Sequence, residues 1–224
     1  MSYSLIIPIY NEENTIRELI KSIKKLNANI EIVIVNDGST DKTESVLLGY
    51  EKPIKIINKP TNEGKGAAII TGFKHSTKDT IILMDADLEI SFAEIPKLIE
   101  IYETLKPDVL IGTRWENIEF NLNLNYLGNI FINLLFNFLN NSNYKDILCC
   151  LKMMDSKIFK SLNIKSQGFD IESEIMSKLT SKNINIIEQT IYYKRRSKAE
   201  GKKLNFFDSF IIIWTIIKLR FSQS

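Results

Sequence analysis

Short segments made almost entirely of apolar residues alternate with amphipathic segments in the amino-terminal part of the chain. The apolar segments are residues 4–9, 30–35, 54–57 and 80–84. Segments with apolar residues at helical spacing lie between them, at residues 12–26, 40–50 and 64–76. Strands that are apolar on both faces are typical of a parallel sheet covered by helices on both sides. The pattern therefore predicts an α/β fold with a mostly parallel central sheet flanked by helices.

The size and composition of the chain are those of one folded domain. A chain of 224 residues buries roughly 70% of the surface that it exposes when unfolded. With 44% hydrophobic and 25% charged residues, the chain is neither disordered nor fibrous. A net charge of +2 excludes a protein that coats nucleic acid through a large basic excess, so any anion site must be local.

The cysteines and the amino end indicate a cytoplasmic, disulfide-free protein. The two cysteines, Cys149 and Cys150, are neighbours in the sequence, and the first residues show no charged-then-apolar leader pattern. The apolar segment 206–217 contains Asp208 and is shorter than the roughly 20 residues of a spanning helix. We therefore expect no membrane span from this segment alone.

Polar motifs follow three of the predicted strands. They are Pro8-Ile9-Tyr10-Asn11-Glu12-Glu13, Asn36-Asp37-Gly38-Ser39-Thr40-Asp41 and Asp85-Ala86-Asp87-Leu88-Glu89. In sheets of this kind, ligands bind at the carboxyl ends of the strands. Asp85 and Asp87 would repel each other at the end of a buried strand unless a cation lay between them. A divalent ion such as Mg²⁺ or Mn²⁺ typically binds one or two carboxylates together with substrate phosphates. The pair of aspartates therefore indicates a ligand with phosphates, and we expect a nucleoside diphosphate.

Each motif also has a purely structural interpretation. Residues 36–39 alone would form a turn and a helix cap. The segment Gly64-Lys65-Gly66 would form a flexible helix entrance, and it is not a P-loop, because Gly66 replaces the Ser or Thr that binds magnesium. Glu89 would be a solvated loop acid, and His75, the single histidine, would have a structural role.

Taken together, the motifs resemble family 2 of the glycosyltransferases, which have the nucleotide-sugar-binding GT-A fold. The segments that carry this resemblance are residues 8–12, 36–39, 62–68, 85–87 and 112–114. Later segments are similar to those of dolichyl- and polyprenyl-phosphate sugar synthases, namely residues 146–152, 169–175 and 196–204. The chain departs from these relatives at Cys150, where they have glycine, and at Leu151, where they have an aromatic residue. A basic residue that relatives carry after Arg114 is not evident in residues 121–133.

The resemblance implies a role for individual residues. The base and ribose pocket would be lined by Pro8, Tyr10, Glu12, Asn36 and Asp37. Lys65 would lie near the diphosphate, and the Mg²⁺ or Mn²⁺ ion would be held by Asp85, Asp87 and Glu89. The candidate catalytic residues are Asp87, Arg114, Asp146 and Arg196. We expect residues 195–203 to form a basic arm in which Arg196 and Lys202 contact the acceptor phosphate.

The function that the resemblance implies is inverting transfer of a sugar from a nucleotide sugar to a polyprenyl (dolichyl-type) phosphate. Such a phosphate is largely ionised at neutral pH, since its second pKa is about 6, and needs no general base. The second alternative is a soluble family 2 glycosyltransferase that adds a sugar to a hydroxyl of a polysaccharide or glycolipid. Such a hydroxyl would need a general base, for which Asp146 is the first candidate, with Glu172 and Glu174 behind it. A non-catalytic nucleotide-sugar-binding partner of a membrane protein is the third alternative.

Two segments with broad apolar faces, 126–139 and 206–220, predict helices at the membrane surface. Trp214 would lie at headgroup depth, with Lys218 and Arg220 on anionic lipid. The alternatives are core helices, or helices that pack against a second copy or an integral membrane partner. We thus expect a GT-A domain over 1–204, with a nucleotide half at about 1–115 and an acceptor half at about 116–204, and an interfacial helix over 205–224.

Overall fold

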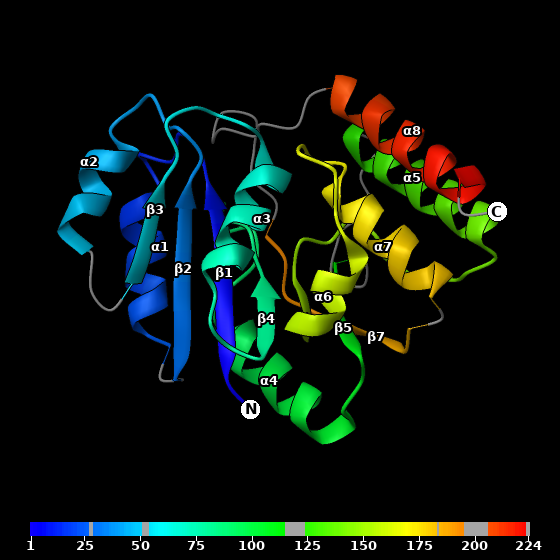
Figure 1. Cartoon of the computed structure of the whole chain (residues 1–224), viewed down its shortest axis with the longest axis horizontal. Coiled ribbons are helices and arrows are strands. Elements are labelled where there is room, and N and C mark those ends of the chain that lie inside the picture. The colour runs from blue at the N-terminus through cyan, green and yellow to red at the C-terminus, as the bar shows by residue number, and fades with distance from the viewer. Residues whose placement is uncertain (27–28, 51–53, 115–123, 183, 195–205, 223–224) are drawn as a thin grey trace.

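The computed structural model describes residues 1–26, 29–50, 54–114, 124–182, 184–194 and 206–222. Its centre is a seven-stranded sheet with the strand order β3-β2-β1-β4-β6-β5-β7 (Figure 1). The strands are β1 (Tyr3–Ile9), β2 (Ile30–Asn36), β3 (Ile54–Asn58), β4 (Thr80–Leu83), β5 (Val109–Thr113), β6 (Lys152–Asp155) and β7 (Ile186–Thr190). Only β6 runs antiparallel to its neighbours, β4 and β5. The predicted mostly parallel α/β sheet is confirmed.

Helices cover the sheet and extend past one end of it. They are α1 (Ile16–Lys24), α2 (Thr43–Leu47), α3 (Lys65–His75), α4 (Glu94–Leu105), α5 (Leu124–Asn140), α6 (Ser156–Leu162), α7 (Ile171–Ser181) and α8 (Phe206–Ser222), with a 3₁₀ turn, η1, at Leu48–Tyr50. Leu5, Ile6 and Ile7 of β1 are all fully buried, as expected for a strand covered on both faces. The packing is close, because a Cβ added to Gly72 of α3 would lie 2.5 Å from the Ile6 side chain.

Two predicted helices begin later than the sequence pattern indicates, because their first residues hold two loops together. The backbone N–H of Glu12 donates to Thr43 Oγ1 (2.7 Å), and the N–H of Asn11 donates to Ser39 Oγ (2.9 Å). The backbone N–H of Thr40 donates to Asn11 Oδ1 (2.8 Å). Helix α1 therefore starts at Ile16 rather than at residue 12, and α2 at Thr43 rather than at residue 40.

Strand β7 ends at Thr190, and the chain then makes a single bridge between Tyr193 and Ile90. This bridge brings the chain next to the loop that follows β4.

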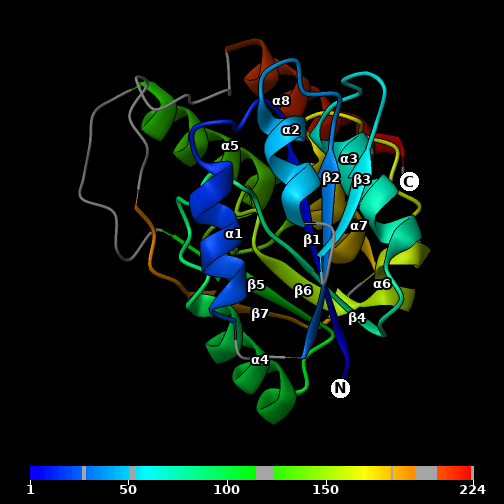
Figure 2. The same ribbon diagram turned by 90° about the vertical axis from the view of Figure 1, so that its left-hand side faces the viewer.

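Helices α5, α7 and α8 form a group, of which α8 lies past the carboxyl ends of β1 and β2 (Figures 1 and 2). Helix α8 packs against both α5 and α7. The hydroxyl of Thr215 donates to Asp170 Oδ2 (3.0 Å), and Nε of Arg220 donates to the Leu139 carbonyl (2.6 Å). The last helix is thus part of the folded domain and lies close to the edge of the sheet where ligands are expected.

Candidate functional site

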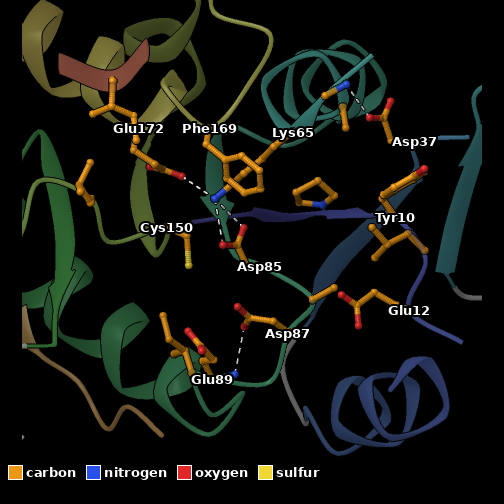
Figure 3. Close-up of a pocket in the computed structure, with 18 of the residues that line it drawn as sticks. Tyr10, Glu12, Asp37, Lys65, Asp85, Asp87, Glu89, Cys150, Phe169 and Glu172 are labelled. Atoms are coloured by element: carbon orange, nitrogen blue, oxygen red, sulfur yellow. Dashed lines mark hydrogen bonds and ion pairs between the residues drawn. The ribbon is translucent and has the colours of Figure 1, made fainter. Parts of the chain in front are cut away.

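A cavity of about 520 Å³ opens at the carboxyl ends of the parallel strands (Figure 3). Its walls come from the loops after β1, β2 and β4, the start of α3, the loop before β6, the start of α7 and the inner faces of α5 and α8. Of the residues predicted to form the site, the cavity is lined by Pro8, Tyr10, Glu12, Asp37, Lys65, Asp85, Asp87, Glu89 and Arg114. Tertiary structure thus brings most of the predicted motifs to one place.

The loop after β2 forms one wall of this cavity. Asp37, only 2% exposed, accepts the backbone N–H of Gly64 (2.7 Å) and lies 2.6 Å from Lys59 Nζ. Gly38 has φ +66°, and a Cβ there would lie 2.4 Å from the Thr61 backbone, so the turn requires glycine. Asp37 therefore connects the β2 turn to the glycine that precedes α3.

Asn36 does not line the cavity, although a pocket role was expected. It is 1% exposed, its amide donates to Asn58 Oδ1 (3.0 Å), and its Oδ1 accepts the backbone N–H of Ser39 (3.2 Å). The side chain thus shapes the turn that presents Asp37. The structural interpretation of this motif holds for Asn36, and Asp37 lies at the cavity.

The three acidic residues after β4 have different partners. Asp85 is paired with Lys65, whose Nζ lies 2.8 Å from Asp85 Oδ1. Glu89 accepts a hydrogen bond from the Tyr193 hydroxyl (2.6 Å). Asp87 accepts the backbone N–H of Glu89 (3.0 Å). Burial, together with the charges of Asp85 and Glu89, raises the pKa of Asp87 to about 7.

These carboxylates fit a hard divalent cation that also binds substrate oxygens. Within the described part of the chain, no three acidic, histidine or cysteine side chains converge closely enough to hold a metal ion by themselves. Mg²⁺ and Mn²⁺ need oxygen ligands, and Mg²⁺ sites typically combine one or two carboxylates with phosphates and water. Burial and the charges of Asp85 and Glu89 raise the pKa of Asp87, and a divalent ion would supply positive charge that offsets these effects.

Lys65 lies between two carboxylates. Its Nζ is 2.9 Å from Glu172 Oε1 as well as 2.8 Å from Asp85 Oδ1. Burial alone would lower the pKa of Lys65, but Asp85 and Glu172 outweigh it and the pKa lies well above its usual value. A Cβ on the next residue, Gly66, would lie 2.3 Å from the Ser166 carbonyl. Glycine therefore lets α3 approach the segment that leads into α7.

Lys152 is a functional candidate that the sequence reasoning missed. This side chain is 0% exposed and contacts Glu172 Oε2 and the Cys149 carbonyl. A lysine within the apolar run Leu151-Lys152-Met153-Met154 is the signal that could have found it, because a buried lysine requires a charged partner. Glu172, expected behind Asp146 as a base, is instead the partner of two lysines.

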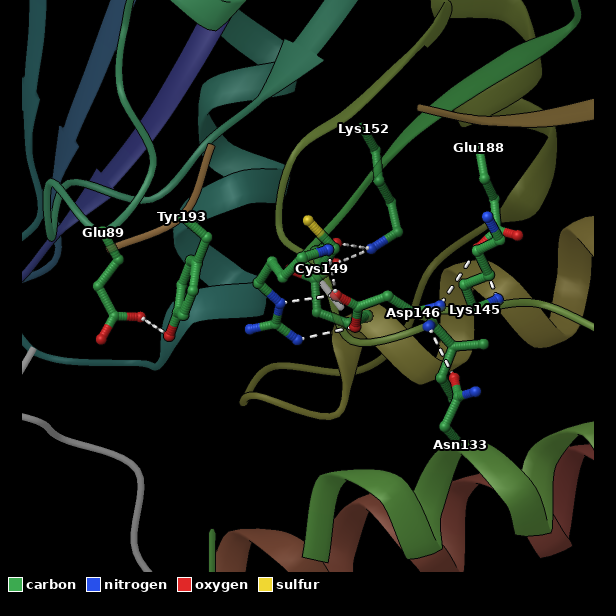
Figure 4. Close-up of polar contacts among 11 residues, drawn as sticks. Glu89, Asn133, Lys145, Asp146, Cys149, Lys152, Glu188 and Tyr193 are labelled. Carbon is green, nitrogen blue, oxygen red and sulfur yellow. Dashed lines mark hydrogen bonds and ion pairs between the residues drawn. The ribbon is translucent and has the colours of Figure 1, made fainter. Parts of the chain in front are cut away.

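Asp146 does not line the cavity, whereas its partner Arg114 does. Figure 4 shows Asp146 with its polar contacts. It is 1% exposed, and Arg114 binds it through Nε (2.7 Å), Nη2 (2.8 Å) and the backbone N–H (3.1 Å). The Arg114 guanidinium lies 5.4 Å from the centre of the Tyr193 ring. Burial alone would lower the pKa of Arg114, but Asp146 outweighs it and keeps the guanidinium charged. Asp146 thus positions Arg114 and is not placed to accept a proton from a substrate.

Two further acidic residues, Glu188 and Glu174, lie outside the cavity. Glu188 of β7 accepts the backbone N–H groups of Lys145 (2.7 Å) and Asp146 (3.2 Å), and burial raises its pKa. Glu174 is paired with Lys178 at 2.5 Å on the far side of α7.

Cys150 lies in the cavity wall and Cys149 is buried, both as free thiols. A hydrogen bond with Cys149, burial and the charge of Asp85 raise the pKa of Cys150 well above its usual value. The Cys150 thiol is therefore neutral at physiological pH.

The basic arm expected over 195–203, with Arg196 and Lys202, lies outside the described residues. The chain enters this segment from Lys194, whose backbone N–H donates to the Glu89 carbonyl (2.7 Å).

The fold and this cavity define the class of the protein, an α/β enzyme fold with a carboxylate-rich ligand site at the strand ends. The chain belongs to glycosyl transferase family 2, whose family model matches residues 4–162. This confirms the family resemblance seen in the motifs.

Named relatives and solved structures agree with this assignment. The chain is 31% identical over 212 residues to the dolichol-phosphate mannosyltransferase of Pyrococcus furiosus, covering 90% of this chain and 59% of that protein. It is 36% identical over 107 residues to the bactoprenol glucosyl transferase of Shigella phage SfX, covering 45% of this chain and 35% of that one. The chain therefore spans less than two thirds of these relatives.

The fold matches glucosyl-3-phosphoglycerate synthase from Mycobacterium tuberculosis, solved with Mn²⁺, UDP and phosphoglyceric acid. The TM-score is 0.77 at 17% identity, and the match covers 98% of this chain and 78% of the synthase. At this level of identity the similarity concerns the fold alone, which is GT-A.

Proposed function

We propose that this protein is a metal-dependent inverting glycosyltransferase that moves a sugar from a nucleotide sugar to a polyprenyl phosphate at a membrane surface. One observation carries the proposal. A single cavity is lined both by the carboxylates after β4 and by Asn129, Ile132, Ser209 and Ile212 of α5 and α8. The cavity thus extends from a site suited to a diphosphate and its cation to a pair of helices with apolar outer faces.

The loops after β1 and β2 and the start of α3 would bind the donor. Pro8, Tyr10, Glu12 and Asp37 line this part of the cavity and would contact the nucleoside. Asp85, Asp87 and Glu89 would hold Mg²⁺ or Mn²⁺, which when bound stabilises negative charge on the leaving diphosphate. The Lys65 ammonium, which lines the same cavity, would add positive charge to this stabilisation. Residues 1–115 form the donor half in this proposal.

The acceptor half, residues 116–204 together with Arg114, would receive a lipid phosphate. Arg114 lines the cavity, and its guanidinium is held charged and oriented by Asp146. A phosphate oxygen already carries negative charge at neutral pH, so it attacks without a base. Attack from the face opposite the leaving group inverts the anomeric centre. A sugar hydroxyl would need a base, and the candidates Asp146 and Glu172 are both engaged in buried ion pairs.

The test of this function is transfer from a panel of nucleotide sugars, with and without polyprenyl phosphate, in the presence of Mn²⁺. We expect labelled sugar to pass into the organic phase only when the lipid phosphate is present. Transfer to a sugar hydroxyl with none to the lipid would contradict the proposal. Binding of the nucleotide sugar without any turnover would favour the non-catalytic alternative.

The membrane would be contacted by the outer faces of α5 and α8. Large apolar side chains are exposed there, namely Leu127, Phe131, Leu134 and Phe138 on α5 and Phe207, Phe210, Ile211, Trp214 and Phe221 on α8. A patch of this size marks an interaction surface, and the exposed Lys218 and Arg220 on α8 suit anionic lipid. No helix in the described ranges is both long and apolar enough to span a bilayer. We therefore propose peripheral attachment from the cytoplasmic side, with 205–224 as the interfacial segment.

We expect Trp214→Glu to weaken binding to anionic vesicles, because it places a charge among the exposed apolar side chains. Flotation with vesicles that contain polyprenyl phosphate measures this. Leu105→Glu is the matched control, since Leu105 is 55% exposed but lies at the end of α4, away from α5 and α8 (Figure 1). Equal flotation of both variants and of the wild type would contradict the membrane contact. A stable dimer that the Trp214 variant disrupts would point to a second copy as the occupant.

We expect Arg196→Ala to weaken use of the lipid phosphate while leaving the affinity for the nucleotide sugar nearly unchanged. A charged hydrogen bond of this kind contributes about 1.5–3 kcal/mol, which corresponds to roughly a 10- to 150-fold loss in kcat/KM for the acceptor. Initial rates at varied acceptor concentration measure it. An equally large loss of donor affinity would place the arm over the diphosphate instead, and no loss of either would leave it a solvated loop.

A further inference from the structure

One of the proposed metal ligands already has a positively charged partner in this structure. The Lys65 ammonium lies 2.8 Å from Asp85 Oδ1 and 2.9 Å from Glu172 Oε1 (Figure 3). The three side chains are 10%, 27% and 4% exposed for Lys65, Asp85 and Glu172. At such distances, two cations on one carboxylate repel each other strongly in a partly desolvated site. A divalent ion can therefore bind Asp85 fully only when Lys65 moves away from it.

Glu172 is held in place from the side opposite Lys65. Lys152 of β6, fully buried, contacts the second carboxylate oxygen of Glu172 and also the Cys149 carbonyl. Burial alone would raise the pKa of Glu172, but the ammonium groups of Lys152 and Lys65 outweigh it and the pKa lies below its usual value. Glu172 is thus a fixed anion in the cavity wall.

The Lys65 side chain is longer than that of Glu172 and has more rotatable bonds. This flexible side chain reaches into the cavity from the first residue of α3. The Phe169 ring, whose centre is 6.0 Å from Lys65 Nζ, offers it a second favourable contact on the Glu172 side. A lysine released from Asp85 therefore keeps partners that hold it inside the cavity.

We propose that Glu172 is a positioning residue that retains Lys65 in the cavity while Asp85 exchanges this lysine for the cation that accompanies the donor. The proposal rests on the proposed function in that it takes Asp85 as a metal ligand. It explains why the ammonium has two carboxylate partners from two different elements. It also implies that a divalent ion alone binds weakly, and that a diphosphate, as a new anionic partner for Lys65, strengthens its binding.

Binding of Mn²⁺ alone to the purified full chain tests this, with free Mn²⁺ followed by electron paramagnetic resonance. Lys65→Gln removes the competitor for Asp85. We expect the Mn²⁺ affinity to rise at least about tenfold, because the apparent affinity of a site is reduced to the fraction of molecules in which the competitor leaves it free. Glu172→Gln leaves Lys65 dependent on Asp85, and we expect the affinity to fall about fivefold for the same reason.

Glu174→Gln is the matched control. Glu174 lies on the same helix, is 2% exposed and pairs with a lysine at 2.5 Å, but it does not line the cavity. We expect Glu174→Gln to leave Mn²⁺ binding unchanged. If Glu172→Gln lowers the unfolding temperature because Lys152 loses its partner, the double variant Glu172→Gln/Lys152→Met removes the unpaired ammonium and carries the same expectation.

The double variant Lys65→Gln/Glu172→Gln separates this role from a general effect of charge. If Glu172 acts through Lys65, Glu172→Gln has no effect on Mn²⁺ affinity once Lys65 is absent. The proposal would be overturned if Glu172→Gln lowered the Mn²⁺ affinity equally with and without Lys65. It would also be overturned if Lys65→Gln left the Mn²⁺ affinity unchanged. A chain that transfers sugar normally but fails these tests refutes only the role of Glu172, whereas a chain that passes them but transfers no sugar refutes only the proposed function.

Discussion

Replacement of Asp87 by asparagine is expected to abolish sugar transfer while leaving the fold intact. An amide is a poorer ligand for a hard cation and removes one negative charge from the site. Loss of one pre-organised electrostatic group typically costs about 10²–10³-fold in turnover. Burial and the charges of Asp85 and Glu89 raise the pKa of Asp87 to about 7. A neutral amide avoids both penalties, so we expect no loss of thermal stability.

The measurement is turnover at saturating Mn²⁺ together with thermal unfolding of the same preparation. Asp79→Asn is a suitable control, because Asp79 precedes β4 at its other end and lies outside the cavity. Full activity of Asp87→Asn would rule out Asp87 as a metal ligand. Loss of activity with a lowered unfolding temperature would show instead that Asp87 supports the fold.

Replacement of Asp146 by asparagine is expected to have the largest effect on stability. It leaves the Arg114 guanidinium, 15% exposed, without its buried counter-ion. Removing one partner of a buried ion pair destabilises a protein by about 3–5 kcal/mol. We therefore expect a drop of about 3 kcal/mol in the free energy of unfolding, measured by urea denaturation. Arg114→Met/Asp146→Asn, in which the unpaired charge is removed, should recover part of this loss.

The same variant separates two roles of Asp146. If Asp146 positions Arg114, Asp146→Asn raises KM for the lipid phosphate and leaves the shape of the pH–rate profile unchanged. A general base would behave differently, because its removal lowers kcat and abolishes the acidic limb of the profile. A profile that loses this limb would restore Asp146 as a base and favour a hydroxyl acceptor.

Local sequence signals were sufficient for β1 to β4, and most of the predicted site residues line one cavity. The uniformly apolar segments 4–9, 30–35, 54–57 and 80–84 predicted four parallel strands, which the structure confirms nearly residue for residue. The motifs after three of them meet in one cavity because the carboxyl ends of parallel strands lie at one edge of a sheet. Helix starts were less predictable, because Asn11 and Thr40 use their polar groups in bonds between loops.

What the sequence by itself determined is therefore the fold class, the family and the edge of the sheet at which the cavity lies, since each depends on patterns within short segments. Only the tertiary structure decided which charges pair across the site. Lys65, Lys152 and Glu172 come from α3, β6 and α7, and Asp146 reaches Arg114 across 32 residues of chain. Ion pairing depends on distances in space and on burial, which sequence spacing does not specify. The sequence therefore predicted Asp146 at the acceptor, whereas in the structure it pairs with Arg114 outside the cavity.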